Sequence, residues 1–266
     1  MSFTPKCHDV TMVHNILQTF RFPTELILEI IDHARYWPEL CGSFEHKSIL
    51  ADEEWTTSYT QANLYKVFAV SSTLYHSKTK LKEIEFEIVS HDQGWTTEGT
   101  KGTYKTTSWF EVSVLRPKYK RRRNTRLAHT FEGRFFKHPE DAFDDIRKDG
   151  WDIVPRPSRE REPQRLCYEG METTSGVTEG EYTWWLQGNI VTKGMSIFDG
   201  EMVKRYRVVW GCHRNPVFEG NEGAGLGEGF VDSLQEGDNI AIWARAKRRG
   251  WENHVYGIRT RIRFSF

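Results

Sequence analysis

The chain has 266 residues, and its 37 Lys+Arg and 37 Asp+Glu residues give a formal net charge of +0. No global field therefore draws it onto nucleic acid or an anionic membrane, so we expect no specific nucleic-acid binding and no membrane partner. No stretch approaches the roughly 18 apolar residues that span a bilayer, and the N-terminus lacks the apolar core of a signal peptide. We expect a protein of the cytoplasm, with the nucleus as the alternative.

A helix is predicted at Phe22–Leu40. Pro23 suits the first helical position, and Pro38 ends the segment because proline cannot continue the hydrogen-bond ladder. Apolar side chains recur along this segment at helical spacing, and the stripe consists of Leu26, Ile27, Ile30, Ile31 and Ala34. We expect residues 1–55 to form an N-terminal helical segment, with a further short helix at Val10–Phe20.

From about residue 56 onward, the period of the sequence changes from helical to alternating. In Leu81–Ser90, apolar side chains alternate with Glu83, Glu85 and Glu87, as in a strand with one buried and one solvated face. Further strand candidates are Trp109–Leu115, Tyr182–Val191, Glu201–Trp210, Ile240–Ala246 and Tyr256–Phe266. Many short strands predict an antiparallel β-sandwich, jelly-roll or galactose-binding-like, over residues 56–266. A long charged insertion is expected around residues 118–175.

The segment Phe22–Leu40, FPTELILEIIDHARYWPEL, resembles the opening of an F-box, where Leu-Pro-x-Glu-Leu leads into an amphipathic helix. Pro23, Glu25 and Leu26 match that motif, and Phe22 stands where the family has Leu. The resemblance implies that the helix docks the Skp1 subunit of a ubiquitin ligase. Its docking residues would be Phe22, Pro23, Leu26, Ile27, Ile30 and Ile31. The alternative is a helix that simply packs its apolar stripe on the sandwich.

Three later motifs widen this resemblance. They are Ser90–Trp95 (SHDQGW), Gly237–Ala246 (GDNIAIWARA) and Gly250–Val255 (GWENHV). Together with the N-terminal segment they resemble an uncharacterised fungal family that joins a short F-box-like motif to a β-rich domain. The resemblance implies an architecture more than an activity.

The same motifs contain residues that could bind a small ligand. Flat indoles stack on sugar faces, while nearby Asn, Asp and His side chains bind hydroxyl groups. The candidates are His91, Asp92, Trp95, Trp109, Trp251 and Asn253. The alternatives are core packing for the tryptophans and a polar turn at a strand end, held by the side chains of Asp92 and Gln93.

Signals of catalysis and of metal binding are weak. The neighbours His91 and Asp92 could transfer protons, but no nucleophile or metalloenzyme motif such as GxSxG or HExxH accompanies them. The four cysteines are scattered without a CxxC pair, which predicts reduced thiols and no zinc site; they are Cys7, Cys41, Cys167 and Cys212. We therefore expect no enzyme activity, no cofactor and no metal.

Two compositional runs complete the sequence. Glu219–Gly229 is rich in glycine but lacks the Lys-Ser/Thr of a phosphate loop, so it predicts an irregular turn. The basic run Lys118–Arg126 suits solvated hairpin charges, a nuclear-localisation signal or a phosphate-contacting patch.

The order of these features predicts a non-enzymatic interaction module. In this interpretation the sandwich binds a protein target, and the N-terminal helix recruits a Skp1-containing ubiquitin ligase. The alternative is a sandwich that binds a carbohydrate or another small ligand, with a purely structural N-terminal helix.

Overall fold

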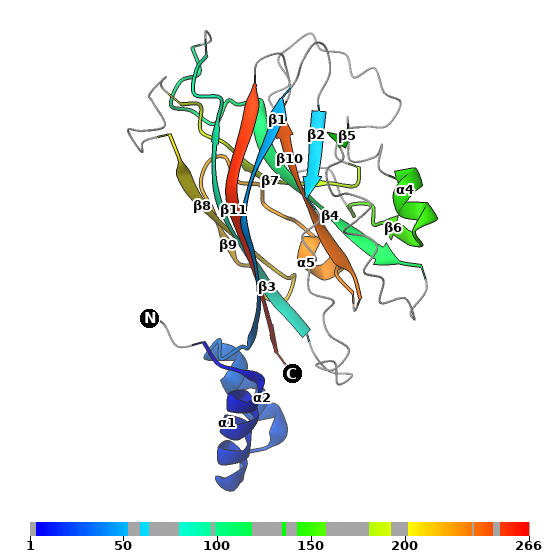
Figure 1. Ribbon diagram of the computed structural model, residues 1–266. Helices are drawn as coiled ribbons and strands as arrows, with labels where there is room; N and C mark the ends of the chain where they lie inside the picture. The colour runs from blue at the N-terminus through cyan, green and yellow to red at the C-terminus, as the bar shows by residue number, and fades with distance from the viewer. Residues whose placement is uncertain are drawn as a thin grey trace.

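The protein is mainly β, with two antiparallel sheets and a helical hairpin at one end (Figure 1). The computed structural model describes residues 4–52, 59–63, 80–96, 99–118, 135–136, 143–157, 181–192, 202–235, 237–246 and 251–265. This architecture confirms the prediction of a β-rich antiparallel fold.

The first sheet has the strand order β1-β11-β3-β8-β9. Its members are β1 (Glu39–Asp52), β11 (Glu252–Ser265), β3 (Lys80–Asp92), β8 (Lys204–Gly211) and β9 (Phe218–Glu219). The long central pair β3 and β11 is in register from Asp92 opposite Asn253 to Lys80 opposite Ser265, with two local shifts.

The second sheet has the strand order β5-β2-β10-β4-β6, and β7 also pairs with β4. Its members are β5 (Phe135–Phe136), β2 (Tyr59–Asn63), β10 (Asn239–Ala246), β4 (Ser108–Pro117), β6 (Trp151–Ile153) and β7 (Trp184–Gly188). Each predicted strand segment from Leu81 onward overlaps a strand of these two sheets, but Tyr182–Val191 extends beyond β7 at both ends and Glu201–Trp210 begins before β8. Glu201 and Phe266, at the ends of two of the predicted segments, lie outside the described residues.

Inward side chains of both sheets form one apolar core. Alternation along each strand sends every second side chain inward, as with Phe86 on β3 and Val112 on β4, both 0% exposed. The short helix α5 (Phe230–Ser233) adds Phe230, whose ring contacts Trp184 and Trp210 edge to face at centroid distances of 5.1 and 5.2 Å. Burial of these aromatic rings removes a large apolar area from water and so stabilises the core.

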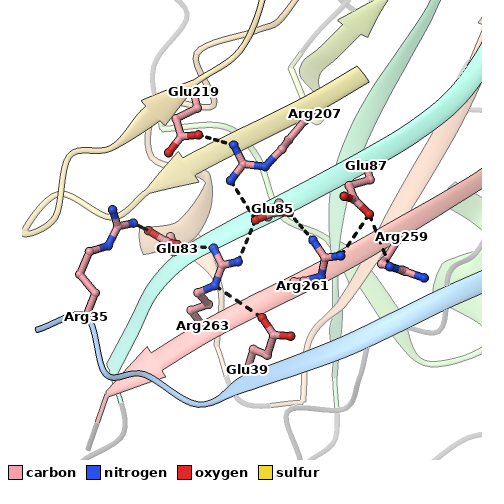
Figure 2. Close-up of polar contacts among 10 residues, drawn as sticks. All are labelled: Arg35, Glu39, Glu83, Glu85, Glu87, Arg207, Glu219, Arg259, Arg261 and Arg263. Carbon is pink, nitrogen blue, oxygen red and sulfur yellow. Dashed lines mark hydrogen bonds and ion pairs between the residues drawn. The ribbon is translucent and has the colours of Figure 1, made fainter. Parts of the chain in front are cut away.

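The outer face of the first sheet carries a ladder of opposite charges (Figure 2). Glutamates of β3 face arginines of β11 and β8; the ladder comprises Glu83, Glu85, Glu87, Arg207, Arg259, Arg261 and Arg263. The face of β3 that was predicted to be solvated is therefore partly buried, because the arginine side chains cover Glu83 and Glu85.

The outer face of the second sheet is also covered. Helix α4 (Phe143–Lys148) and β6 place Ile146 and Trp151 against Leu115 and Trp243. These two elements come from the predicted insertion at 118–175. Most of that insertion lies outside the described residues. The undescribed part contains Cys167 and the whole basic run Lys118–Arg126 apart from Lys118.

The β-rich part begins earlier than the predicted boundary at residue 56. Strand β1 starts at Glu39 and pairs along β11, from Glu39 opposite Arg263 to Asp52 opposite Glu252. It lies at an edge of the first sheet, and its sequence, ELCGSFEHKSILAD, does not alternate. Edge strands carry charged and polar residues that blunt unwanted pairing, so an alternating apolar pattern is not required of β1.

Two helices precede β1 and form the hairpin, α1 (Cys7–Thr19) and α2 (Thr24–His33). Pro23, predicted as the first helical residue, is instead the N-cap, and helix α2 begins at Thr24. It ends at His33, before the predicted end, because Arg35 adopts a left-handed backbone with φ of 49°. The hairpin extends beyond the ends of β3 and β11 (Figure 1). None of the helices within the described ranges has the length and apolar character needed to cross a bilayer.

Candidate docking surface on the helical hairpin

The hairpin has a small apolar core of its own. Val10 of α1 packs against Ile27 and Ile31 of α2, and all three are at most 5% exposed. Half-buried Val13 and Leu17 extend this contact along α1. Their spacing of three and four residues places them on one face of the helix, and that face joins the two helices.

A second set of large apolar side chains on the hairpin faces solvent. Seven of the ten exposed large apolar side chains in the described part of the chain belong to it: Met12, Ile16, Phe20, Phe22, Leu26, Leu28 and Ile30. Their exposed fractions run from 37% to 67%. Single exposed apolar residues are ordinary, but such a concentration on two short helices is typical of interaction surfaces.

Six of these seven side chains form one band, which we call the apolar band. Met12, Ile16 and Phe20 follow each other at intervals of four residues, as do Phe22, Leu26 and Ile30. Helical geometry puts Met12 and Ile16 of α1, and Leu26 and Ile30 of α2, about a quarter turn from the buried face of their helix, while Phe20 and Phe22 follow at the turn between the helices. Because α1 and α2 run in opposite directions (Figure 1), both rows lie on the same side of the hairpin.

The turn between the helices joins the two rows of the band. Arg21 has a φ of 63° and donates its backbone N–H to Gln18 O over 2.8 Å, which ends α1 and reverses the chain. Pro23 then opens α2, accepting the first helical hydrogen bond from Ile27 N. The reversal brings the rings of Phe20 and Phe22 to a centroid distance of 6.5 Å.

Polar contacts fix the hairpin to the first sheet. Asp32 at the end of α2 accepts hydrogen bonds from Trp37 Nε1 at 2.9 Å and Lys82 Nζ at 2.8 Å. Arg35 donates to Glu83, so the hairpin is tied into the charge ladder (Figure 2). The guanidinium of Arg35 also lies over the buried Trp37 ring at 5.3 Å. These contacts leave the apolar band free of the sheet.

The docking residues implied by the F-box resemblance are divided by this geometry. Phe22, Leu26 and Ile30 are 42%, 40% and 38% exposed and belong to the apolar band, and Pro23 is exposed beside them. Ile27 and Ile31 are buried against α1 and hold the hairpin together. The α1 half of the band was not identified from the sequence, although the spacing of Met12, Ile16 and Phe20 is the signal that could have revealed it.

The second predicted site, in the later motifs, is brought together by strand pairing. His91 lies opposite His254 and Asp92 opposite Asn253 at the end of the β3/β11 ladder. Asn253 Nδ2 donates to the carbonyl oxygen of Trp109 on β4 over 2.9 Å, which links the two sheets. The motifs SHDQGW and GWENHV are therefore neighbours in space.

Most of this second cluster is inaccessible to solvent. His91, Asp92, Trp109, Trp251 and Asn253 are at most 6% exposed, whereas Trp95 is 56% exposed. The indole of Trp109 stacks on Trp185 and receives the Arg245 guanidinium on its ring, and Trp251 packs with Val191 and Ala246. Of the six predicted ligand-binding residues, Trp95 alone is exposed to a ligand from solvent.

The polar turn predicted after β3 is confirmed. Asp92 Oδ1 accepts a hydrogen bond from Gly94 N at 3.0 Å, and Gln93 Nε2 donates to Trp95 O at 2.7 Å. Asp92 also accepts from Thr192 Oγ1 at 2.7 Å, which ties the turn to the segment after β7. The left-handed φ of 86° at Gly94 explains why glycine occupies this position.

His91 is buried within this cluster among ring and hydroxyl groups. Its ring stacks on His254 at a centroid distance of 4.5 Å, and its Nε2 lies 2.9 Å from the Tyr256 hydroxyl. Burial lowers the pKa of His91, an effect that the hydrogen bond with the Asp92 carbonyl only partly opposes. Within the described residues no group of three or more His, Cys, Asp or Glu side chains could hold a metal ion.

A comparison with models of protein families and a comparison with curated proteins found no match to this chain. The resemblances to the F-box and to the fungal family therefore stay predictions, and the function has to be inferred from the site itself.

Proposed function

We propose that the chain is a non-enzymatic interaction module that docks a Skp1-type subunit of a ubiquitin ligase through the apolar band of its hairpin. The observation that carries the proposal is the exposure of Phe22, Leu26 and Ile30, with Met12, Ile16 and Phe20 beside them. A band of this kind suits the helix-in-groove mode, in which an amphipathic helix lays its apolar face into a partner's groove.

The β-rich body would present the target in such an adaptor. We propose that it is a sandwich of the jelly-roll or galactose-binding-like type, which the shared core of its two antiparallel sheets supports. Its long β3 and β11 strands lead from the hairpin to the far end, where Trp95 is exposed. Docking and target binding would then occupy opposite ends of the molecule, in the cytoplasm or nucleus.

A binding measurement with matched variants tests the docking proposal. Purified chain and purified Skp1 are compared by biolayer interferometry for the parent, Leu26→Asp, Ile16→Asp and Leu28→Asp. We expect the first two variants to weaken binding more than about tenfold, because each puts a charge into the buried centre of an interface.

Leu28→Asp is the matched control. Leu28 is 37% exposed, close to the 40% of Leu26, but it lies on the other side of α2, outside the band. It should therefore leave binding unchanged. Absence of binding by the parent chain would refute the Skp1 proposal, and equal losses in all three variants would refute the band as its surface.

A further inference from the structure

A pocket of about 340 Å³ lies between the hairpin and the first sheet. Its residues come from α1, α2, the linker after α2, the first residues of β3 and the last residue of β11. Helical periodicity puts Thr11 and Leu28, which line it, on the side of the hairpin away from the apolar band. The pocket is therefore a separate feature from the docking surface.

The inner part of the pocket is apolar and firmly held. Val10 and Ile31, which are 4% and 5% exposed, belong to the hairpin core, and buried Pro38 accepts a hydrogen bond from Phe264 N at 3.2 Å through its carbonyl. Leu28, 37% exposed, adds an apolar side chain that is free of the hairpin core. An apolar body of a ligand would find solvent-excluded contacts here.

The charges of the pocket are two lysines and two carboxylates. Lys82 and Asp32 neutralise each other at 2.8 Å, and Asp32 accepts a further bond from Trp37 Nε1. Lys80 and Glu29 are both exposed, and neither takes part in an ion pair among the described residues. One cation and one anion thus remain available next to an apolar cavity.

We propose that this pocket binds a small zwitterion with an apolar body, of the class of a large apolar amino acid. Its carboxylate would pair with Lys80, its ammonium with Glu29, and its side chain would contact Leu28 and Ile31. The volume is at the lower end of the range of small-molecule sites, about 300–1,000 Å³, which suits a single amino acid better than a peptide or nucleotide. The proposal is independent of the Skp1 partner.

Isothermal titration with three related probes tests the ligand class. L-phenylalanine carries both charges, N-acetyl-L-phenylalanine only the carboxylate, and phenethylamine only the ammonium. We expect L-phenylalanine to bind most tightly, because it alone satisfies both Lys80 and Glu29. Leucine and tryptophan extend the test to other side-chain shapes.

Two charge variants assign the contacts. Lys80→Gln should weaken the binding of L-phenylalanine and of its N-acetyl form about tenfold and leave the binding of phenethylamine unchanged. Glu29→Gln should weaken the binding of L-phenylalanine and of phenethylamine and leave the binding of the N-acetyl form unchanged. Leu28→Trp, which fills the pocket, should abolish binding of all three probes. Met12→Ser, in the apolar band, should change none of them.

The outcomes decide the proposal clearly. No binding of any of the three amino acids at millimolar concentration would overturn it. Equal affinities of L-phenylalanine and N-acetyl-L-phenylalanine would also overturn it. So would a result in which Met12→Ser abolishes probe binding and Leu28→Trp leaves it intact. Thermal melting of each variant without ligand shows that a loss of binding is not a loss of folding.

Discussion

Asn189 and Asn253 are hydrogen-bonded to each other in the interior, with Asn189 Nδ2 donating to Asn253 Oδ1 over 3.0 Å and both side chains 0% exposed. Asn189 also donates to Ser108 Oγ at 2.7 Å and accepts from Ser90 Oγ at 2.7 Å. Residues far apart in sequence are thereby joined at the end of both sheets where the SHDQGW and GWENHV motifs meet. A fully satisfied buried network of this kind fixes one arrangement of the strands.

The first prediction concerns this pair. Asn253→Ala leaves the Asn189 amide and the Trp109 carbonyl each short of a partner, and an unsatisfied buried polar group costs about 1–3 kcal/mol. We expect the free energy of unfolding to fall by at least about 2 kcal/mol in urea titrations. Asn189→Ala should cost a similar amount, and the double variant less than the sum, because both changes disrupt one network. Additive losses would show that the two side chains act separately.

The second prediction concerns the buried ion pair on the outer face of the second sheet. Arg245 Nη1 lies 2.8 Å from Glu111 Oε2, and the two side chains are 1% and 0% exposed. Arg245→Met takes the Arg245 cation away from the buried Glu111 carboxylate, so it should destabilise the protein by about 3–5 kcal/mol in urea. Lys148→Met breaks the exposed pair with Asp145 and should cost less than about 1 kcal/mol. Equal effects would contradict the burial of the first pair.

The third prediction separates structure from docking within α2. Ile27 is 0% exposed and packs on Val10, so Ile27→Ala should lower the free energy of unfolding by about 2–5 kcal/mol if the hairpin unfolds with the body. Ile30 is 38% exposed, and Ile30→Ala should change stability by less than about 1 kcal/mol. Circular dichroism with urea measures both. A large loss for Ile30→Ala would mean that the band is covered within the chain.

The sequence predicted the body better than its edges. The alternation of Ile84, Phe86 and Ile88 with glutamates appears directly in β3, because its inner face meets the core and its outer face meets arginines. Strand β1 carries no such signal, since an edge strand has only one neighbour and tolerates polar residues on both faces. The end of α2 at His33 was also missed, because a left-handed residue such as Arg35 leaves no clear mark in the sequence.

The candidate sites show the same limit. The motifs around His91 and Asn253 were recognised, but polar residues suggest a surface, and their burial depends on partners such as Asn189 that are distant in sequence. The division of Leu26 from Ile27 likewise depends on where α1 packs. A helical stripe shows which side chains share a face, whereas the packed neighbour decides which of them remain available.

The fourth prediction concerns the glycine-rich segment 219–229. Gly227 has a φ of 62°, and a Cβ at this position would lie 2.0 Å from the ring of Trp210, which is 0% exposed. Trp210 is itself fixed by donating its Nε1 to Gly225 O over 2.6 Å. Gly227→Ala should therefore destabilise the protein by about 2 kcal/mol or more, from backbone strain and overpacking together.

Gly99→Ala is the control for that change, because a Cβ at Gly99 meets nothing within 4 Å. It should alter the melting temperature little. If Gly227→Ala lowered the melting temperature as little as Gly99→Ala does, the glycine-rich segment would be able to move away from Trp210 without cost.

The last prediction concerns pH. Burial lowers the pKa of His91, and the nearby His254 acts in the same direction, while the Asp92 carbonyl and the charges of Asp92 and Glu252 oppose them. In the unfolded chain the histidine pKa is about 6.5. Above that pH both states are neutral at His91, and its contribution to stability is complete. As the pH falls below about 6.5, His91 becomes protonated in the unfolded state but stays neutral in the folded state, so the folded state loses stability. This loss ends once the pH has fallen below the lowered pKa of His91 in the folded state.

Urea titrations between about pH 7.5 and 5 measure this loss, since a tenfold weaker proton affinity in the folded state corresponds to about 1.4 kcal/mol. His91→Phe retains a ring beside His254 but cannot titrate, so its stability should fall less steeply across this window than that of the parent. Carboxylates such as Glu85 titrate in both proteins and cancel in the comparison. Burial by itself would raise the pKa of Glu85, but the hydrogen bonds and charges of Arg207 and Arg263 outweigh burial and lower this pKa. The stability that ionised Glu85 contributes is therefore lost only at a lower pH than the His91 contribution. Parallel curves for His91→Phe and the parent would show that His91 does not cause the acid sensitivity.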